Sequence, residues 1–220
     1  MSNRQTRKHG LLTLIVILLV LVIDQSIKLW VKTNMSLGES IRITPWFYIE
    51  FVENIGMAYG VTIFNKLILS LFRIVAIGFI GWYIYRVIHR SHRLGYVLCL
   101  SVILAGAAGN IIDSMLYGLI FSESTPFSIA EIVPFGSGYA SFLYGKVVDM
   151  FYFPLIVCDW PQWVPFVGGN HFVFFSPVFN FADACISVGI VVLFLFYRND
   201  LEFKKESVAD EENESSSGDE

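Results

Sequence analysis

The residues of this chain best suited to chemistry are acids and amides at the edges of long apolar segments. Asn180 and Asp183 lie three positions apart at the start of the last such segment, so they share one face if it is a helix. Ionisable groups inside membrane segments usually mark a pathway or a reaction site. The alternative is that Asp183 only caps a helix at the membrane interface. Their role therefore depends on which other groups converge on them.

Asp149 is a second candidate, because it is a single acid between two apolar runs. It follows Val147-Val148 and precedes Met150-Phe151. Two carboxylates close together in a low dielectric cannot both ionise easily, so one pKa rises and the pair can share a proton. One carboxylate can then take a proton from water while the other hydrogen-bonds a scissile carbonyl. We choose Asp149 with Asp183 as the pair, and whether they meet is a question for the structure.

Further polar groupings lie near the ends of other segments, and they are Asp24 with Lys28, Asn54 with Gly56, and Asn110 with Asp113. The first has the i, i+4 spacing of an ordinary helix ion pair. The second is also compatible with a simple turn, because Asn and Gly both tolerate positive φ. The third follows small residues at 106–109, a run that favours close helix packing. We interpret this third pair as facing inward and positioning another group.

The composition indicates a polytopic membrane protein. Hydrophobic residues make up 55% of the 220, which is above the apolar share of typical soluble domains. Charged residues make up 15%, and the mean hydropathy is +0.62. The last fifteen residues hold seven acidic and no basic side chains, which accounts for the formal charge of −4. We expect 199–220 to be an acidic, disordered cytoplasmic tail. The three cysteines have no metal-ligand spacing and imply no disulfide framework.

Four apolar runs predict an all-α membrane bundle of four transmembrane helices, at about 11–31, 67–88, 95–117 and 178–197. The first run follows a basic segment at 1–10, but it is too long for a signal peptide and lacks a cleavage site. Basic residues precede the first run, gather around Arg90 between the second and third runs, and follow the last run at Arg198, Lys204 and Lys205. The positive-inside rule therefore makes both termini cytoplasmic. The loops 33–66 and 118–177 are then extracytoplasmic, and 11–198 forms one membrane core.

The two outer loops should carry structure of their own. Residues 46–52 are aromatic and β-branched and predict a strand, so we expect a small extracytoplasmic β-containing subdomain. The 118–177 section is long for a structureless connection, and its many aromatic residues favour the membrane surface. All of the polar groupings above gather near the outer face in this topology.

Other chemistries fit the sequence less well. The four histidines do not cluster with acids at ligand spacing, so a metal hydrolase is not expected. The sequence has neither a phosphate-binding Gly-Lys-Ser/Thr loop nor a nucleophile elbow. A small transporter or proton channel would also use intramembrane acids, but we find no paired halves or broken helices. A non-catalytic membrane scaffold is a third interpretation.

Five polar blocks occur in order along the membrane core. They are Asp24-Gln25-x-x-Lys28, Asn54-x-Gly56-x-Ala58-Tyr59, Gly109-Asn110-x-x-Asp113, Val147-Val148-Asp149-Met150 and Phe179-Asn180-x-Ala182-Asp183. Each block is weak alone, but together and in register they resemble type II signal peptidase, the prolipoprotein signal peptidase family. The resemblance covers 11–198 and leaves out the acidic tail.

The resemblance implies an aspartyl endopeptidase of the bacterial inner membrane, with Asp149 and Asp183 as its catalytic dyad. It gives substrate-binding or supporting roles to Asp24, Lys28, Asn54, Gly56, Asn110, Asp113 and Asn180. Substrates would be lipidated prolipoproteins, cut just before a diacylglyceryl-modified cysteine. No metal or organic cofactor and no nucleic acid is expected, and membrane lipid is the surrounding partner. The oligomeric state stays open, with a monomer as the expectation.

The chain departs from the family pattern at three places. Family members usually have Arg directly after the acid of the third block, where this chain has Ser114, and Lys146 is a candidate substitute for that cation. Met150 replaces a Phe, which is a tolerable apolar exchange. The segments 119–146 and 152–175 resemble insertions and would lie over the site from outside.

Overall fold

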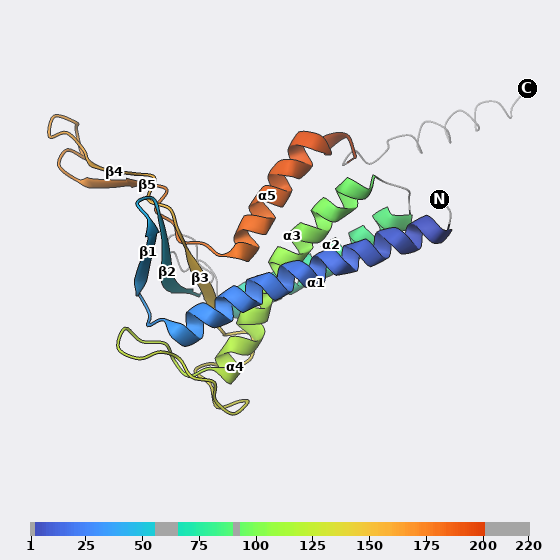
Figure 1. Ribbon diagram of the computed structural model, residues 1–220, viewed down its shortest axis with the longest axis horizontal. Coiled ribbons are helices and arrows are strands. Elements are labelled where there is room, and N and C mark those ends of the chain that lie inside the picture. The colour runs from blue at the N-terminus through green and yellow to red at the C-terminus, as the bar shows by residue number, and fades with distance from the viewer. Residues whose placement is uncertain (1–2, 56–65, 90–92, 201–220) are drawn as a thin grey trace, which may run out of the picture.

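The computed structural model describes residues 3–55, 66–89 and 93–200 (Figure 1). Its helices are α1 Asn3–Asn34, α2 Lys66–His89, α3 Leu94–Ile112, the π-helix Asp113–Tyr117, α4 Gly118–Ile120, α5 Phe181–Phe196 and a 3-10 turn at Arg198–Asp200. Its strands are β1 Ser40–Thr44, β2 Phe47–Asn54, β3 Val147–Tyr152, β4 Ile156–Asp159 and β5 His171–Phe174. From residue 201 on, the predicted acidic tail lies outside the described residues.

Three helical segments are long and apolar enough to cross a membrane, and they are Arg4–Asn34, Lys66–His89 and Leu94–Ile120. These segments contain the first three predicted spans. The fourth predicted span, 178–197, corresponds to α5, which has 16 residues. At a rise of about 1.5 Å per residue α5 is about 24 Å long, against a hydrocarbon core of about 30 Å. It is therefore an apolar helix shorter than the other three.

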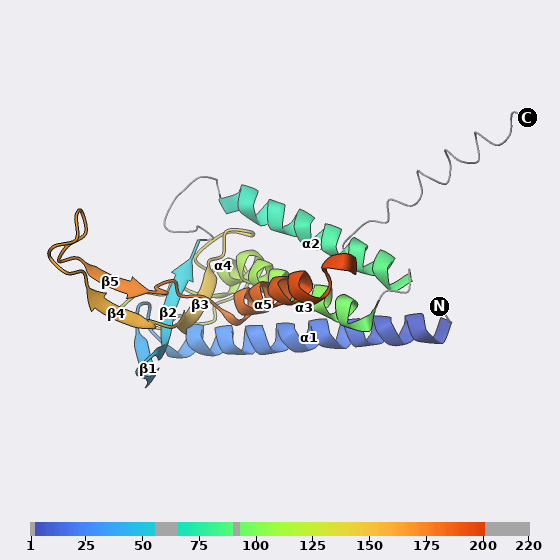
Figure 2. The same cartoon turned by 90° about the horizontal axis from the view of Figure 1, so that it is seen from above.

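Helix α3 is central and packs against α1, α2 and α5 (Figure 2). Its glycines make this possible. A Cβ on Gly106 would meet the Ala182 carbonyl oxygen at 2.5 Å, and one on Gly109 would meet Asp24 Oδ2 at 2.5 Å. The prediction that 106–109 serves close helix packing is thus confirmed. The same close approach brings α1 and the first turn of α5 to one turn of α3.

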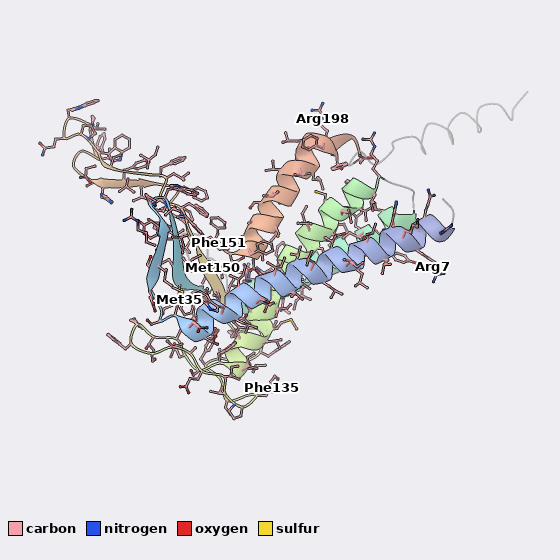
Figure 3. All side chains as sticks on the ribbon, in the orientation of Figure 1. Arg7, Met35, Phe135, Met150, Phe151 and Arg198 are labelled. Carbon is pink, nitrogen blue, oxygen red and sulfur yellow. The ribbon has the colours of Figure 1, made fainter. Side chains whose placement is uncertain are left out.

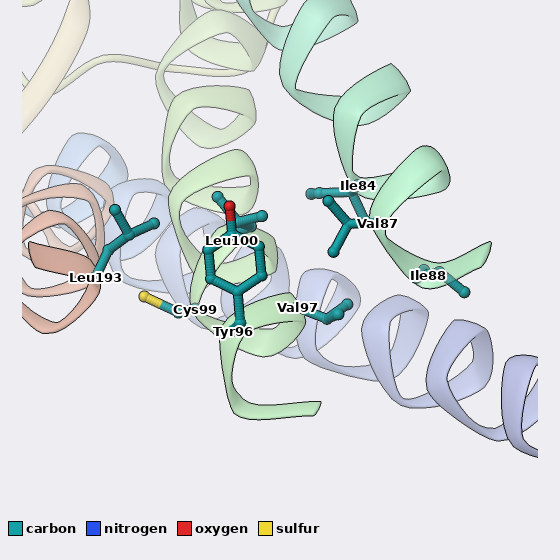
Figure 4. Packing of buried hydrophobic residues seen from close by; sticks show 8 residues of the cluster. All are labelled: Ile84, Val87, Ile88, Tyr96, Val97, Cys99, Leu100 and Leu193. Carbon is teal, nitrogen blue, oxygen red and sulfur yellow. The ribbon is translucent and has the colours of Figure 1, made fainter. Parts of the chain in front are cut away.

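An apolar core joins α2, α3 and α5 at the end of the helices away from the sheet (Figure 4). Its buried residues are Ile84, Val87, Ile88, Tyr96, Val97, Cys99, Leu100 and Leu193. The outward faces are apolar too, since Val75 is 70% and Leu195 69% exposed. Helices that are apolar all round are typical of membrane proteins. The prediction of a membrane-embedded helical core is therefore confirmed.

Strands β1, β2 and β3 form an antiparallel sheet in that order beyond one end of the helices (Figure 1). The strand predicted at 46–52 is confirmed as β2, which continues to Asn54. The sequence does not predict β3, because its run around Asp149 is apolar without the alternation of a half-buried strand. The register pairs Asp149 with Val52, so pairing with β2 sets the position of this acid.

A second core fixes the sheet to the end of α1. Its buried residues are Val31, Met35, Phe51, Tyr117, Phe121, Val148 and Met150, and Figure 3 shows Met35 and Met150 on this side of the molecule. Burying one such large side chain contributes about 1.5–3 kcal/mol. The sheet is therefore held firmly against the helices that carry the other polar groups.

Strands β4 and β5 form a separate hairpin that projects from the sheet (Figure 1). Their register pairs Ile156 with Phe174 and Asp159 with His171. The loop that connects them carries exposed aromatic side chains, with Trp163 81% exposed. Together with β3, this hairpin confirms that the 118–177 section has structure of its own.

Candidate active site

Backbone pairing between β3 and the segment before α5 brings the candidate residues together. The Phe179 carbonyl accepts hydrogen bonds from the backbone N–H groups of Met150 at 3.1 Å and Phe151 at 2.7 Å. Asp149 directly precedes this contact along β3, and Asn180 directly follows it. As a result, Asn180 Nδ2 donates to Asp149 Oδ1 at 2.6 Å.

Three carboxamides bind the two candidate carboxylates, and two of them link the pair. Asn110 Nδ2 donates to Asp183 Oδ1 at 2.7 Å, and Asn180 Nδ2 donates to Asn110 Oδ1 at 3.0 Å. Asn54 Nδ2 donates to the second oxygen of Asp149 at 3.2 Å. The three asparagines selected from the sequence therefore form one hydrogen-bonded network with Asp149 and Asp183.

Asp183 also takes part in the cap of α5. Asn180 is the N-cap residue, and its side-chain oxygen accepts from Asp183 N at 2.9 Å. In return, Asp183 Oδ2 accepts from the Asn180 N–H at 3.3 Å, which completes a capping box. The interpretation of Asp183 as a helix cap is therefore correct in geometry. It does not compete with a chemical role, because the cap fixes the carboxylate while Oδ1 binds Asn110.

Lys28 anchors the layer behind this network. Its fully buried ammonium pairs with Asp24 Oδ2 at 3.0 Å and Asp113 Oδ2 at 2.9 Å, and it donates to Asn110 Oδ1 at 2.8 Å. The other oxygen of Asp24 accepts from Ala182 N in α5 at 3.0 Å. A buried cation needs such partners. Asp24 and Lys28 thus form more than an interfacial pair on one helix, because they tie α1 to α3 and α5.

Asp113 lies where α3 passes into a π-helix, a feature that occurs frequently at functional sites. Asp113 Oδ2 accepts from the Val148 N–H of β3 at 3.3 Å. Gln25 Nε2 donates to Asp113 Oδ1 at 2.9 Å, and Tyr117 donates to Gln25 Oε1 at 3.2 Å. Gln25 belongs to the first of the five sequence blocks, but the sequence prediction assigns it no role at the site.

The environment of Asp149 favours the protonated acid. Its side chain is almost completely buried. Burial, followed by the charge of Asp183, raises the pKa of Asp149 to about 7, against the lowering effect of hydrogen bonds from Asn54 and Asn180. An acid with this pKa can keep its proton at neutral pH beside an ionised carboxylate. The electrostatics thus suit a pair that shares one proton.

One predicted residue, Lys146, is not part of the network, and another, Gly56, lies outside the described residues. Lys146 pairs with Glu53 Oε2 at 3.1 Å and Glu123 Oε1 at 3.4 Å, so its ammonium is engaged in a separate cluster. The position of the usual family arginine is taken by Ser114, which is buried and donates to the Asn110 carbonyl at 3.3 Å. Within 3–55, 66–89 and 93–200, no group of His, Cys, Asp and Glu residues could hold a metal ion.

The arrangement agrees with the comparison of the chain with known families. The family described as Signal peptidase (SPase) II matches residues 16–198. The chain belongs to the signal peptidase II family. Among the relatives of this signal peptidase II, the lipoprotein signal peptidase of Porphyromonas gingivalis is 54% identical over 190 residues, 86% of this chain and 84% of the relative. That of Amoebophilus asiaticus is 37% identical over 185 residues, 81% and 74% of the two chains.

This membership confirms the predicted class of enzyme. A signal peptidase II is a membrane aspartic peptidase. The alternative of a small transporter or proton channel is not favoured. The resemblance stated from the five sequence blocks is confirmed, and the match extends over most of the membrane core.

Solved structures show the same fold. One, described as a bacterial membrane enzyme, gives a TM-score of 0.56 at 20% identity and covers 88% of this signal peptidase II and 92% of that chain. A second gives 0.55 at 19% identity, covering 87% and 93%. At this level of identity, the similarity concerns the arrangement of helices and small sheets.

Proposed function

We propose that this enzyme removes the signal peptide from lipid-modified lipoprotein precursors, with Asp149 and Asp183 as the catalytic dyad. The observation that carries the assignment is the hydrogen-bonded path from Asp149 through Asn180 and Asn110 to Asp183. Two acids from distant parts of the sequence meet at the start of α5 in one network of amides. The relatives named lipoprotein signal peptidase support the substrate class.

In the proposed reaction, one water molecule is consumed for each bond cut. Ionised Asp183 takes a proton from the water molecule while the water oxygen attacks the scissile carbonyl carbon. Protonated Asp149 donates its proton to the carbonyl oxygen. When the tetrahedral intermediate collapses, the proton on Asp183 passes to the leaving amine and Asp149 regains its own. The products are a signal peptide with a new carboxylate and a lipoprotein with a free cysteine amino group.

We infer that α5 completes a bundle of four crossing helices, with both termini cytoplasmic and the site near the outer face of the bacterial inner membrane. Arg7 and Arg198 lie at the end of the helices opposite the sheet (Figure 3), and basic residues favour the cytoplasmic side. The sheet, the dyad and the 118–177 section then face outward. This assigns 11–198 to the peptidase core and leaves 1–10 and 199–220 as cytoplasmic segments.

The substrate would approach from the lipid. Exposed apolar faces of the helices lie in the hydrocarbon, so the acyl chains of the precursor can stay between helices and lipid while the peptide bond reaches the dyad. An unlipidated precursor lacks this anchor and should be a poor substrate. We propose that the enzyme works as a monomer without a metal or organic cofactor.

The test is cleavage of a diacylated prolipoprotein by the purified protein in detergent, without ATP or added metal. We expect release of the signal peptide, insensitivity to EDTA, and much slower cleavage of the same precursor without its lipid. Equal cleavage of both precursors would contradict lipid anchoring. Inhibition by EDTA that zinc reverses would contradict a two-carboxylate mechanism.

A further inference from the structure

A basic side chain of α2, Arg73, lies at the level of the candidate active site. Helices α2 and α3 run in opposite directions and share the core that contains Val87 and Val97. Arg73 lies fourteen residues before Val87, and Asn110 lies thirteen residues after Val97. Both helices rise equally per residue. Counting back along α2 from Val87 and forward along α3 from Val97 therefore places Arg73 at about the level of Asn110, which binds the dyad.

A contact one turn away fixes the same face of α2 against the site. Ser70 is buried, and its hydroxyl donates to the Leu143 carbonyl at 2.9 Å. Gly145, two residues after Leu143, donates its backbone N–H to the carbonyl of Ser114 at 2.9 Å. Arg73 follows Ser70 by three positions, so it projects from the same side of the helix. The face of α2 that carries Arg73 is therefore packed toward the end of α3.

The charge of Arg73 acts on the carboxylates of the site. Its side chain is half-buried, and its charge interacts electrostatically with Asp183, then with Asp149 and Asp113. Among residues 3–55, 66–89 and 93–200, no carboxylate forms a direct ion pair with it. The charge of Arg73 thus acts on the dyad from beyond ion-pair distance.

The site needs a further positive charge. Lys28 is engaged by Asp24 and Asp113, the two acids that lie outside the dyad. The dyad carboxylates accept hydrogen bonds from the three neutral carboxamides described above. Lys66, at the start of α2, also acts electrostatically on Asp113 and Arg73. Even with one proton shared by the dyad, the four acids exceed these two ammonium groups. Uncompensated negative charge is costly where water is excluded, so a nearby guanidinium would stabilise the arrangement.

We propose that Arg73 is the substrate-binding cation of this active site, taking the place of the arginine that Ser114 replaces. Its charge keeps one dyad carboxylate ionised, and its planar donors bind a carbonyl oxygen of the precursor on the α2 side of the scissile bond. Guanidinium suits both tasks, because it is always charged and presents five donors in a fixed geometry. The inference rests on the proposed function of the dyad.

The test compares Arg73→Gln and Arg73→Lys with wild type in the detergent assay, measuring kcat and KM against pH. Removing the cation raises the pKa of nearby carboxyls, so Arg73→Gln should lower kcat/KM at least tenfold and move the limbs of its pH profile upward by about one unit. Arg73→Lys keeps the charge and should leave the limbs in place while KM rises severalfold. The matched control is Arg86→Gln, at the far end of α2, where the guanidinium stacks on Trp82 at 5.1 Å.

Each outcome decides one point. A purely structural Arg73 would reduce the yield of folded protein and leave the pH limbs of the remaining activity unmoved, which would overturn the proposal. Wild-type kinetics of Arg73→Gln would overturn it as well. If Arg73→Gln does not fold, a KM of Arg73→Lys equal to that of wild type would contradict substrate binding. Asp149→Asn in the same assay separates the proposed dyad from the proposed role of Arg73. An active Asp149→Asn would overturn the dyad. An inactive Asp149→Asn beside a fully active Arg73→Gln would overturn only the role of Arg73.

Discussion

Asn180 holds three groups of the site with one buried carboxamide. Its nitrogen donates to Asp149 and Asn110, and its oxygen accepts from the backbone of Asp183. The residue therefore aligns both acids while it begins α5. Its function in the proposed mechanism is to hold the two carboxylates at a fixed separation.

We predict that Asn180→Ser lowers kcat on the order of 10²-fold, the effect of removing one aligned donor from a catalytic site. Serine is also a good N-cap, so α5 should still form. Steady-state cleavage of a lipidated precursor measures the effect, with melting in detergent as the check on folding. The matched control is Asn34→Ser at the exposed end of α1. A kcat equal to that of wild type would show that the Asn180 contacts serve folding only.

The pKa of Asp149 leads to a prediction on pH. Burial and then the charge of Asp183 raise this pKa to about 7. Below that pH Asp149 keeps the proton that the proposed mechanism donates to the scissile carbonyl, and above it the proton is lost. We therefore expect kcat/KM to fall as pH rises through about 7. A profile that stays flat from about pH 6 to 9 would be incompatible with Asp149 as the acid.

The sequence predicts the acids of the site better than the groups that support them. Asp149 is an isolated acid beside apolar residues, and Asp183 lies at the start of an apolar helix. Such acids stand out in the sequence because placing a charge in an apolar environment is energetically costly and usually serves a function. Gln25 and Arg73 lack this signal, since single polar residues within long apolar helices have no pattern that tells inward from lipid-facing positions. The packing of α1 and α2 against α3 determines which way the side chains of Gln25 and Arg73 point.

At the scale of elements, a second buried ion cluster ties α1, the sheet and the insertion together. The fully buried ammonium of Lys32 pairs with Glu53 of β2, and Ser124 Oγ bonds to both of them at 2.9 Å. Lys146 pairs with the other oxygen of Glu53. Glu53 directly precedes Asn54, which binds Asp149, so the cluster fixes the end of β2 at the site.

We predict that Glu53→Gln lowers the free energy of unfolding by about 3–5 kcal/mol, because it leaves Lys32 buried without its counter-charge. Burial opposes ionisation of Glu53, but Lys32 and Lys146 outweigh it and lower its pKa. The contribution of Glu53 to stability is therefore present above its unfolded pKa and lost as pH falls through the lower folded value. Thermal or denaturant unfolding in detergent at neutral pH measures the effect.

The matched control is Glu123→Gln. Glu123 bonds the same Lys146 but its side chain is 66% exposed, so its loss should cost less than about 1 kcal/mol. Equal destabilisation by the two substitutions would show that burial of the Lys32–Glu53 pair is unimportant.

The elements themselves differ in how far the sequence reveals them. The strand at 46–52 is predicted because β-branched and aromatic residues gather there between turn residues. Strand β3 is missed because both of its faces are buried at Val147–Met150, which removes the alternation that marks a strand. Its partner β2 is also remote in sequence, and such pairing leaves no local signal.

At the scale of the whole molecule, the three-stranded sheet lies beyond one end of the long helices and the N-terminus lies at the other (Figure 1). The apolar runs predict this bundle well, since length and composition alone define a span. They predict α5 less well, because the apolar residues of 178–197 include a segment before Asn180 that pairs with β3 instead of continuing the helix. That pairing shortens α5 and places Asp183 beside the sheet.

The most direct test of this account is single-turnover cleavage of a diacylated prolipoprotein by Asp149→Asn and Asp183→Asn. Each carboxylate has its own task in moving protons, so either substitution should abolish cleavage, a loss of several orders of magnitude. Both proteins should stay folded, because asparagine keeps the shape of the side chain, and Asp149→Asn removes a buried ionisable group. Melting in detergent at or near the wild-type temperature checks this. Cleavage by either folded variant at a rate near that of wild type would contradict the dyad.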